Sequence, residues 1–166
     1  MQPVEMQFPD ARILLFCKAP VPGEVKTRLI PALGTDGACD LYTRLLHHAL
    51  QTVVDARLCR LEIWVAPDTS HPFFSDWRGM DGVDLFAQSG EDLGMRMCNA
   101  AMDAGQRAPH RVLIGGDCPL ISAAYLQSAL TKLHSGHDAV LGPAEDGGYV
   151  LLGLNQCDPR LFDRID

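Results

Sequence analysis

Short apolar runs alternate along this chain with longer segments of helical periodicity, and this alternation limits the fold more than any other feature. Runs of four to six mostly apolar residues are typical of buried strands, whereas apolar residues at three- and four-residue spacing indicate one face of a helix. Such a strand–helix repeat favours an α/β fold with a mostly parallel sheet covered on both faces. The predicted strands are 13–16, 61–66, 83–87, 112–115, 138–141 and 149–154, and the predicted helices are 36–56, 90–105 and 122–134.

Length and composition fit an ordinary globular protein. A chain of 166 residues with 47% hydrophobic and 21% charged residues can build one real core, so we expect a single domain over residues 1–166. The net charge of −7 argues against nonspecific nucleic-acid binding, which depends on neutralising phosphates. No apolar run reaches the ~20 residues of a membrane span. The polar start does not resemble a signal peptide and the six cysteines form no C-x-x-C pair, so a reduced, cytoplasmic protein is the simplest interpretation.

An aspartate follows a predicted strand that is an uninterrupted apolar run ended by a pair of glycines. The run Val112–Gly115 is succeeded by Gly116 and Asp117. In open α/β sheets, ligands bind outside the carboxyl ends of the strands. A carboxylate there is either a ligand for metal or substrate or a helix cap, and Ser122 is the better cap for the next helix. We therefore interpret Asp117 as functional.

The segment after the first predicted strand is basic, in contrast to the acidic chain as a whole. It carries Lys18, Lys26 and Arg28 around Pro22 and Gly23. Glycine allows close approach of the backbone to a ligand, and lysine and arginine bind phosphate oxygens. A solvated surface loop is the structural alternative, but the position after the first strand favours phosphate binding.

Two further segments offer candidate residues. Gly94, in the first turn of a predicted helix, lowers helix stability, so close approach of a ligand is one explanation for it, and Arg96 would then lie near the strand ends. Glu145 and Asp146 follow another predicted strand and precede two glycines. A tight Asp–Gly turn explains that pair equally well.

Several familiar motifs are missing or misplaced. The chain has no G-x-G-x-x-G, and its Gly23–Thr27 segment lacks the glycine that precedes the lysine of a P-loop. The letters His134-Ser-Gly-His137 match an H-x-G-H motif of one class of nucleotidyltransferases. That motif belongs after an early strand, whereas here it joins a helix to a later strand, so we assign it no function.

Four segments of the sequence match a known pattern: FCKAPVPGEVKTRL (16–29), GEDLGMRM (90–97), IGGDCPL (114–120) and LGPAEDGGY (141–149). Together they resemble the radical-SAM/selenodomain-associated transferases of bacteria, which are glycosyltransferase-like. These proteins belong to the GT-A nucleotide-diphospho-sugar transferase superfamily. A more distant similarity is to molybdenum-cofactor and phospholactate guanylyltransferases. Family members usually extend further at the C-terminus, so we expect this chain to lack their last elements.

The resemblance implies a GT-A-like three-layer sandwich with a mixed, mostly parallel sheet, binding a nucleoside triphosphate or nucleotide sugar with Mg²⁺ or Mn²⁺. It places Asp117 at the metal, with Glu145 and Asp146 completing the metal site. Lys26, Arg28 and Asp117 are the expected catalytic residues. The expected phosphate- and nucleotide-binding residues are Lys18, Pro22, Gly23, Gly94 and Arg96.

The resemblance leaves the reaction open between three alternatives. Nucleotidyl transfer is favoured because the first loop carries Lys26 and Arg28 and because Asp117 is single, without the second aspartate of a D-x-D pair. The others are glycosyl transfer from a nucleotide sugar and nucleotide binding without turnover. The partners expected are a nucleotide and an unknown acceptor, with no nucleic acid or membrane, and a homo-oligomer stays open.

Overall fold

A single six-stranded sheet forms the centre of the computed structural model, which describes residues 3, 5–163 and 165. The strand order is β3-β2-β1-β4-β6-β5. The first four strands in this order are parallel, and β6 runs antiparallel to both of its neighbours. The predicted mixed, mostly parallel sheet is therefore confirmed. The strands are β1 (Ala11–Lys18), β2 (Arg60–Ala66), β3 (Val83–Ala87), β4 (His110–Gly115), β5 (Ala139–Pro143) and β6 (Tyr149–Leu154).

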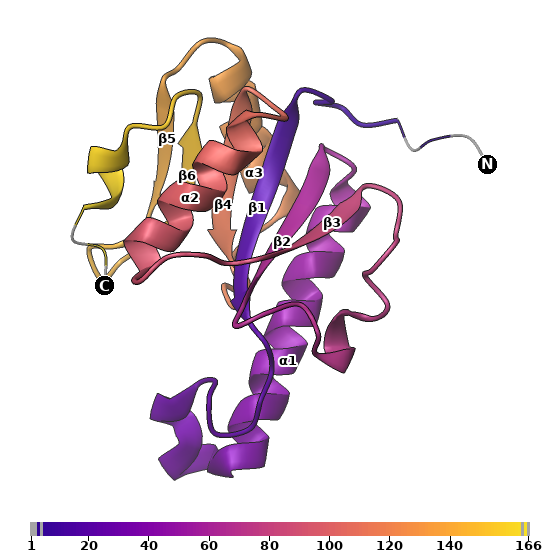
Figure 1. Ribbon diagram of the computed structural model, residues 1–166, viewed down its shortest axis with the longest axis vertical. Helices are drawn as coiled ribbons and strands as arrows, with labels where there is room; N and C mark the ends of the chain where they lie inside the picture. Colours follow the sequence, from indigo (N-terminus) through magenta and orange to yellow (C-terminus); the bar gives the residue numbers. More distant parts are fainter. Residues whose placement is uncertain (1–2, 4, 164, 166) are drawn as a thin grey trace.

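Helices cover both faces of the sheet, which gives three layers (Figure 1). Because side chains alternate along a strand, Ile13 and Leu15 of β1 face one layer while Leu14 faces the other. Helices α1 and α3 pack on the first face, and α2 packs on the second. None of the described helices is both long and apolar enough to cross a bilayer. The helices are α1 (Ile30–Ala56), α2 (Leu93–Gly105) and α3 (Ala123–His134), with short 3₁₀ turns η1 (Thr27–Leu29), η2 (Pro72–Phe74) and η3 (Pro159–Phe162).

Helix α1 begins at Ile30, earlier than the predicted start near residue 36. Gly34 interrupts it with φ 74° and ψ 167°, so a short first turn joins the main helix across a kink. Pro31 and Gly34 gave this first turn the composition of a loop. The turn and the preceding segment project beyond the end of β1 (Figure 1).

The reversed strand β6 brings one more loop to the edge where β1 and β4 end. Since β6 is antiparallel to both β4 and β5, strand β5 runs in the direction of β4. The connection 144–148 therefore leaves β5 and enters β6 at the carboxyl edge of the parallel strands. This edge carries the candidate site.

Candidate functional site

A cavity of about 820 Å³ opens at the carboxyl ends of β1 and β4. Its walls come from the end of β1, the loop 24–29, α1, α2 and the turn after β4. Volumes of 300–1,000 Å³ are typical of small-molecule sites. The sequence-predicted residues that line it are Lys18, Lys26, Arg28, Arg96 and Asp117.

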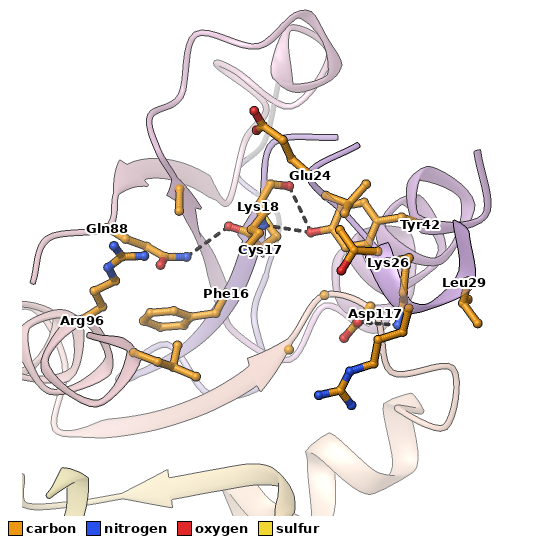
Figure 2. A pocket seen from close by; sticks show the side chains of 17 residues that line it. Phe16, Cys17, Lys18, Glu24, Lys26, Leu29, Tyr42, Gln88, Arg96 and Asp117 are labelled. Carbon is orange, nitrogen blue, oxygen red and sulfur yellow. Dashed lines mark hydrogen bonds and ion pairs between the residues drawn. The ribbon is translucent and has the colours of Figure 1, made fainter. Parts of the chain in front are cut away.

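Lys26 and Asp117 form an ion pair across the wall of this cavity, with Lys26 Nζ 2.7 Å from Asp117 Oδ2 (Figure 2). The Lys26 backbone has φ 49° and ψ 39°, a left-handed conformation that is uncommon for a residue other than glycine. The neighbouring Val25 is buried and anchors the loop in the core. Local backbone geometry thus places the ammonium group of Lys26 on the carboxylate of Asp117.

Two polar side chains that sequence analysis missed hold the end of β1 in place. The Tyr42 hydroxyl accepts a hydrogen bond from Lys18 N at 2.8 Å and donates one to Lys18 O at 3.0 Å. Gln88 Nε2 donates to Cys17 O at 3.0 Å and to Trp64 O at 2.9 Å, which ties β1 to β2 (Figure 2). Burial raises the pKa of Tyr42, so its hydroxyl keeps the proton it donates. The only signal for Gln88 in the sequence was its position directly after a strand.

The cavity is rich in positive charge. Lys18, Lys26, Arg28 and Arg96 line it, whereas Glu24 and Asp117 are the acidic residues in its lining. Arg96 lies on the opposite side from the Lys26–Asp117 pair (Figure 2), and its Nε donates to Gly90 O at 3.0 Å. In a chain of net charge −7, this local excess of cations fits an anionic ligand.

Three of the predicted nucleotide-binding residues do not belong to the lining of this cavity: Pro22, Gly23 and Gly94. Pro22 and Gly23 are exposed on the loop, where Gly23 supplies a backbone φ of 86°. Gly94 is buried, and an added Cβ would collide with the backbone carbonyl of Phe162. The packing of the chain's own C-terminal segment therefore gives a structural reason for glycine at position 94, and a ligand contact there stays a prediction.

The acidic loop lies at the predicted edge, but its carboxylates do not converge with Asp117. Glu145 and Asp146 are exposed, and Asp146 Oδ1 accepts a hydrogen bond from Gly148 N at 3.0 Å. Among the described residues, these two carboxylates and Asp117 do not form a group with ligand atoms within 4.8 Å of one another. Their joint role at a metal stays a prediction. Of these three carboxylates, only Asp117 lines the cationic cavity within the described residues, where it pairs with Lys26.

A second, more apolar cavity of about 340 Å³ adjoins the first. Asp117, Phe16 and Leu93 line both cavities. Gly148 and Tyr149 line only the second one, so the start of β6 contributes to it. Asp117 thus stands between a cationic space and an apolar space.

The structure resembles several solved structures. A protein from Desulfovibrio desulfuricans G20, provisionally named a nucleotide-diphospho-sugar transferase, is 37% identical, with a TM-score of 0.83 over 95% of this chain and 69% of that chain. The 4-diphosphocytidyl-2C-methyl-D-erythritol synthase of Anaerococcus prevotii DSM 20548 is 10% identical, with a TM-score of 0.56 over 92% of this chain and 73% of that chain. The manganese complex of Rv0371c from Mycobacterium tuberculosis H37Rv is 14% identical, with a TM-score of 0.57 over 95% and 76%.

These similarities confirm the predicted GT-A-like fold, and the two distant ones show the fold alone. They do not bear on an association with radical-SAM proteins. No functionally curated protein matches the chain. The family model described as "Uncharacterized protein conserved in bacteria" (DUF2064) matches residues 49–166, which is most of the sequence. The chain therefore belongs to this family of bacterial proteins.

Proposed function

We propose that this protein is a metal-dependent transferase that binds the phosphates of a nucleoside triphosphate or nucleotide sugar in the cationic cavity. One observation carries the proposal: four cationic side chains from three separate segments line one cavity in an acidic chain. Lys18 comes from β1, Lys26 and Arg28 from the loop and η1, and Arg96 from α2. Phosphate groups are the anions that such a combination of lysine and arginine binds best.

Lys26 and Arg28 have the position to stabilise the charge that develops on a leaving phosphate group. Phosphoryl and nucleotidyl transfers depend chiefly on positioning and on electrostatic stabilisation of phosphate oxygens. When a nucleotide binds, the ammonium group of Lys26 would exchange its contact with Asp117 for a phosphate oxygen. Arg96 would hold the ligand from the other side of the cavity.

Asp117 fits the metal that the family resemblance implies. It offers a half-exposed carboxylate at the cavity wall, and Mg²⁺ takes one or two protein carboxylates together with phosphate oxygens. When bound there, Mg²⁺ or Mn²⁺ would neutralise and orient the phosphates. Glu145 and Asp146, on the loop at the same edge, are the proposed further ligands.

The apolar cavity is the proposed site of the acceptor. It shares Asp117 with the cationic cavity, so an acceptor group there would lie beside the bound phosphates. We favour nucleotidyl transfer because Lys26 and Arg28 line the same cavity as a single aspartate, Asp117. The alternative, glycosyl transfer, is favoured by the name of the 37% identical protein from Desulfovibrio desulfuricans G20.

The test is a thermal shift of the purified protein with each nucleoside triphosphate and several nucleotide sugars, with and without Mg²⁺ or Mn²⁺. A ligand that binds the native state raises Tm by mass action. We expect a metal-dependent rise with at least one nucleotide, and none in Asp117→Asn. The variant's own Tm should change little, because the ion pair with Lys26 is partly open to solvent and solvent-screened pairs contribute about 0–1 kcal/mol.

The products then identify the reaction. Released pyrophosphate indicates nucleotidyl transfer, and a released nucleoside diphosphate indicates glycosyl transfer. Metal-dependent nucleotide binding without turnover over a broad panel of acceptors would contradict transferase activity. It would support the alternative, a protein that binds nucleotide without converting it. A Tm rise that persists in Asp117→Asn would show that Asp117 is not the metal ligand, and no rise with any nucleotide would contradict the proposal as a whole.

A further inference from the structure

We propose that Asp10, His110 and His134 bind a transition-metal dication, with Zn²⁺ as the best match, at the edge of the sheet opposite the cationic cavity. One nitrogen of each histidine and one oxygen of Asp10 lie within 4.8 Å of one another. Asp10 directly precedes β1, His110 begins β4, and His134 ends α3. The three residues thus meet where the parallel strands start (Figure 1), and the proposal does not depend on the function of the cavity.

The distances suit ligands of a common ion better than they suit hydrogen bonds. His110 Nε2 lies 3.5 Å and His134 Nδ1 lies 3.7 Å from Asp10 Oδ2. A good N–H···O bond is shorter, about 2.7–3.2 Å. Two ligands of a tetrahedral zinc ion, each about 2.0–2.1 Å from the metal, are separated by about 3.3 Å. A small closure of the three side chains would therefore supply three ligands of such an ion and leave its fourth position to water.

The tautomer of His110 is set for metal binding. Asn155 Nδ2 donates to Leu133 O and to His137 O, both at 2.8 Å, so Asn155 Oδ1 is left as an acceptor. It lies 2.6 Å from His110 Nδ1, which must then carry the hydrogen. The Nε2 atom of neutral His110 consequently presents a lone pair toward Asp10. A partner that receives the other N–H is the usual support of a metal-ligating histidine.

One carboxylate oxygen of Asp10 has no hydrogen-bond partner among the described residues, and a bound metal would interact with it. The Oδ1 atom of Asp10 is buried and has no hydrogen-bond partner within the described part of the chain. Buried polar atoms without partners are uncommon and costly. A metal that binds the carboxylate would satisfy this oxygen as well, either directly or through a bound water.

The aromatic surroundings hold the two rings near each other. The rings of His110 and His134 meet edge to face with centroids 5.4 Å apart, and Phe8 packs against His134 at 6.0 Å. His110 is only 15% exposed, which limits its freedom to turn away. Two imidazoles and one carboxylate form a ligand set for zinc and its first-row neighbours, whereas Mg²⁺ prefers oxygen ligands alone. This site therefore differs in metal preference from the one at Asp117.

The test uses the purified full chain after removal of metals with a chelator. Zn²⁺ is titrated by calorimetry and Co²⁺ by its visible absorption, which is strong for four- or five-coordinate ions. We expect one ion per chain, with affinity at least tenfold weaker in His134→Ala and in Asp10→Asn.

Two control variants separate this site from other ligands. His48→Ala removes an exposed histidine of α1 away from the cluster, and it should leave zinc affinity unchanged. Asp117→Asn should also leave it unchanged, because Asp117 lies at the other edge of the sheet. The proposal is overturned if folded wild-type protein binds no ion at micromolar Zn²⁺ or Co²⁺, or if His134→Ala and Asp10→Asn bind as tightly as the wild type.

Discussion

At the scale of single residues, the backbone conformation of Lys26 brings its ammonium group onto Asp117 in the cationic cavity. Its left-handed backbone conformation costs roughly 1–2 kcal/mol for a residue with a side chain, yet it places Nζ 2.7 Å from Asp117 Oδ2. Arg57 has a similar φ of 50°, but there the conformation serves the ordinary purpose of ending α1. At Lys26 the same conformation precedes only a short 3₁₀ turn, so its consequence is the contact with Asp117.

We expect Lys26→Met to change the affinities for metal and for nucleotide in opposite directions. Loss of the ammonium group frees Asp117, so Mn²⁺ alone should bind more tightly, whereas the metal–nucleotide complex should bind more weakly, by about tenfold or more for one lost charge-assisted contact. Proton relaxation enhancement measures Mn²⁺ binding, and calorimetry measures nucleotide binding. Lys18→Met is the matched control, since Lys18 lines the same cavity but forms no ion pair in the described structure. Weaker Mn²⁺ binding in Lys26→Met would contradict the proposal that Lys26 competes with the metal for Asp117.

The sequence identified the charged residues of the cavity but not the ones that hold its walls. Asp117 and Lys26 follow strand ends, where ligand-binding side chains are expected from chain order alone. Tyr42 and Gln88 act through backbone atoms of β1 that are 24 and 71 positions away in the sequence. Such contacts depend on how strands and helices pack, so no local pattern predicts them.

At the scale of elements, strand positions were predictable but their directions were not. The runs 83–87 and 149–154 match β3 and β6 at both ends. The antiparallel direction of β6 and its place between β4 and β5 arise from long-range pairing. As a result, the sequence placed Glu145 and Asp146 at the correct edge without showing that their side chains stay apart from Asp117.

Helix α2 and the C-terminal turn η3 are in close contact at Gly94, which makes this contact testable. A Cβ at position 94 would collide with the Phe162 carbonyl, so we expect Gly94→Ala to lower the free energy of unfolding by about 1–3 kcal/mol. This is the reverse of the gain of up to ~1 kcal/mol that alanine usually gives inside a helix. Urea unfolding followed by circular dichroism measures the change.

The control for this prediction is Gly37→Ala in α1. A Cβ there meets only Leu33 Cβ of the same helix, at 3.3 Å, so any loss should be smaller than at position 94. Equal or higher stability of Gly94→Ala relative to the wild type would show that η3 does not pack tightly on α2.

At the scale of the whole molecule, two buried thiols make stability depend on alkaline pH. Burial raises the pKa of Cys17 to about 12 and that of Cys59 to about 12, from the ordinary thiol value of 9.0. Between these values the unfolded chain loses its thiol protons while the folded chain keeps them, so stability falls as pH rises. Each thiol should contribute a loss on the order of 1 kcal/mol at pH 10 relative to neutral pH.

Urea unfolding at pH 7.5 and pH 10 tests this expectation. The double variant Cys17→Ala/Cys59→Ala should lose less stability between the two pH values than the wild type does, although both substitutions lower its stability at each pH. An unchanged loss in the double variant would mean that other groups, such as Tyr42 with its raised pKa, account for the alkaline effect.

The pairing of β1 with β4 also restricts how this protein can evolve. The two strands are in continuous register from Ala11 opposite His110 to Phe16 opposite Gly115. They run from the end of the sheet that holds Asp10 and His110 to the end that holds the cationic cavity. A deletion of one residue within either strand would turn all later side chains to the opposite face and displace one edge relative to the other. These strands can therefore diverge by substitution alone, and differences in length between relatives belong in the loops that join them.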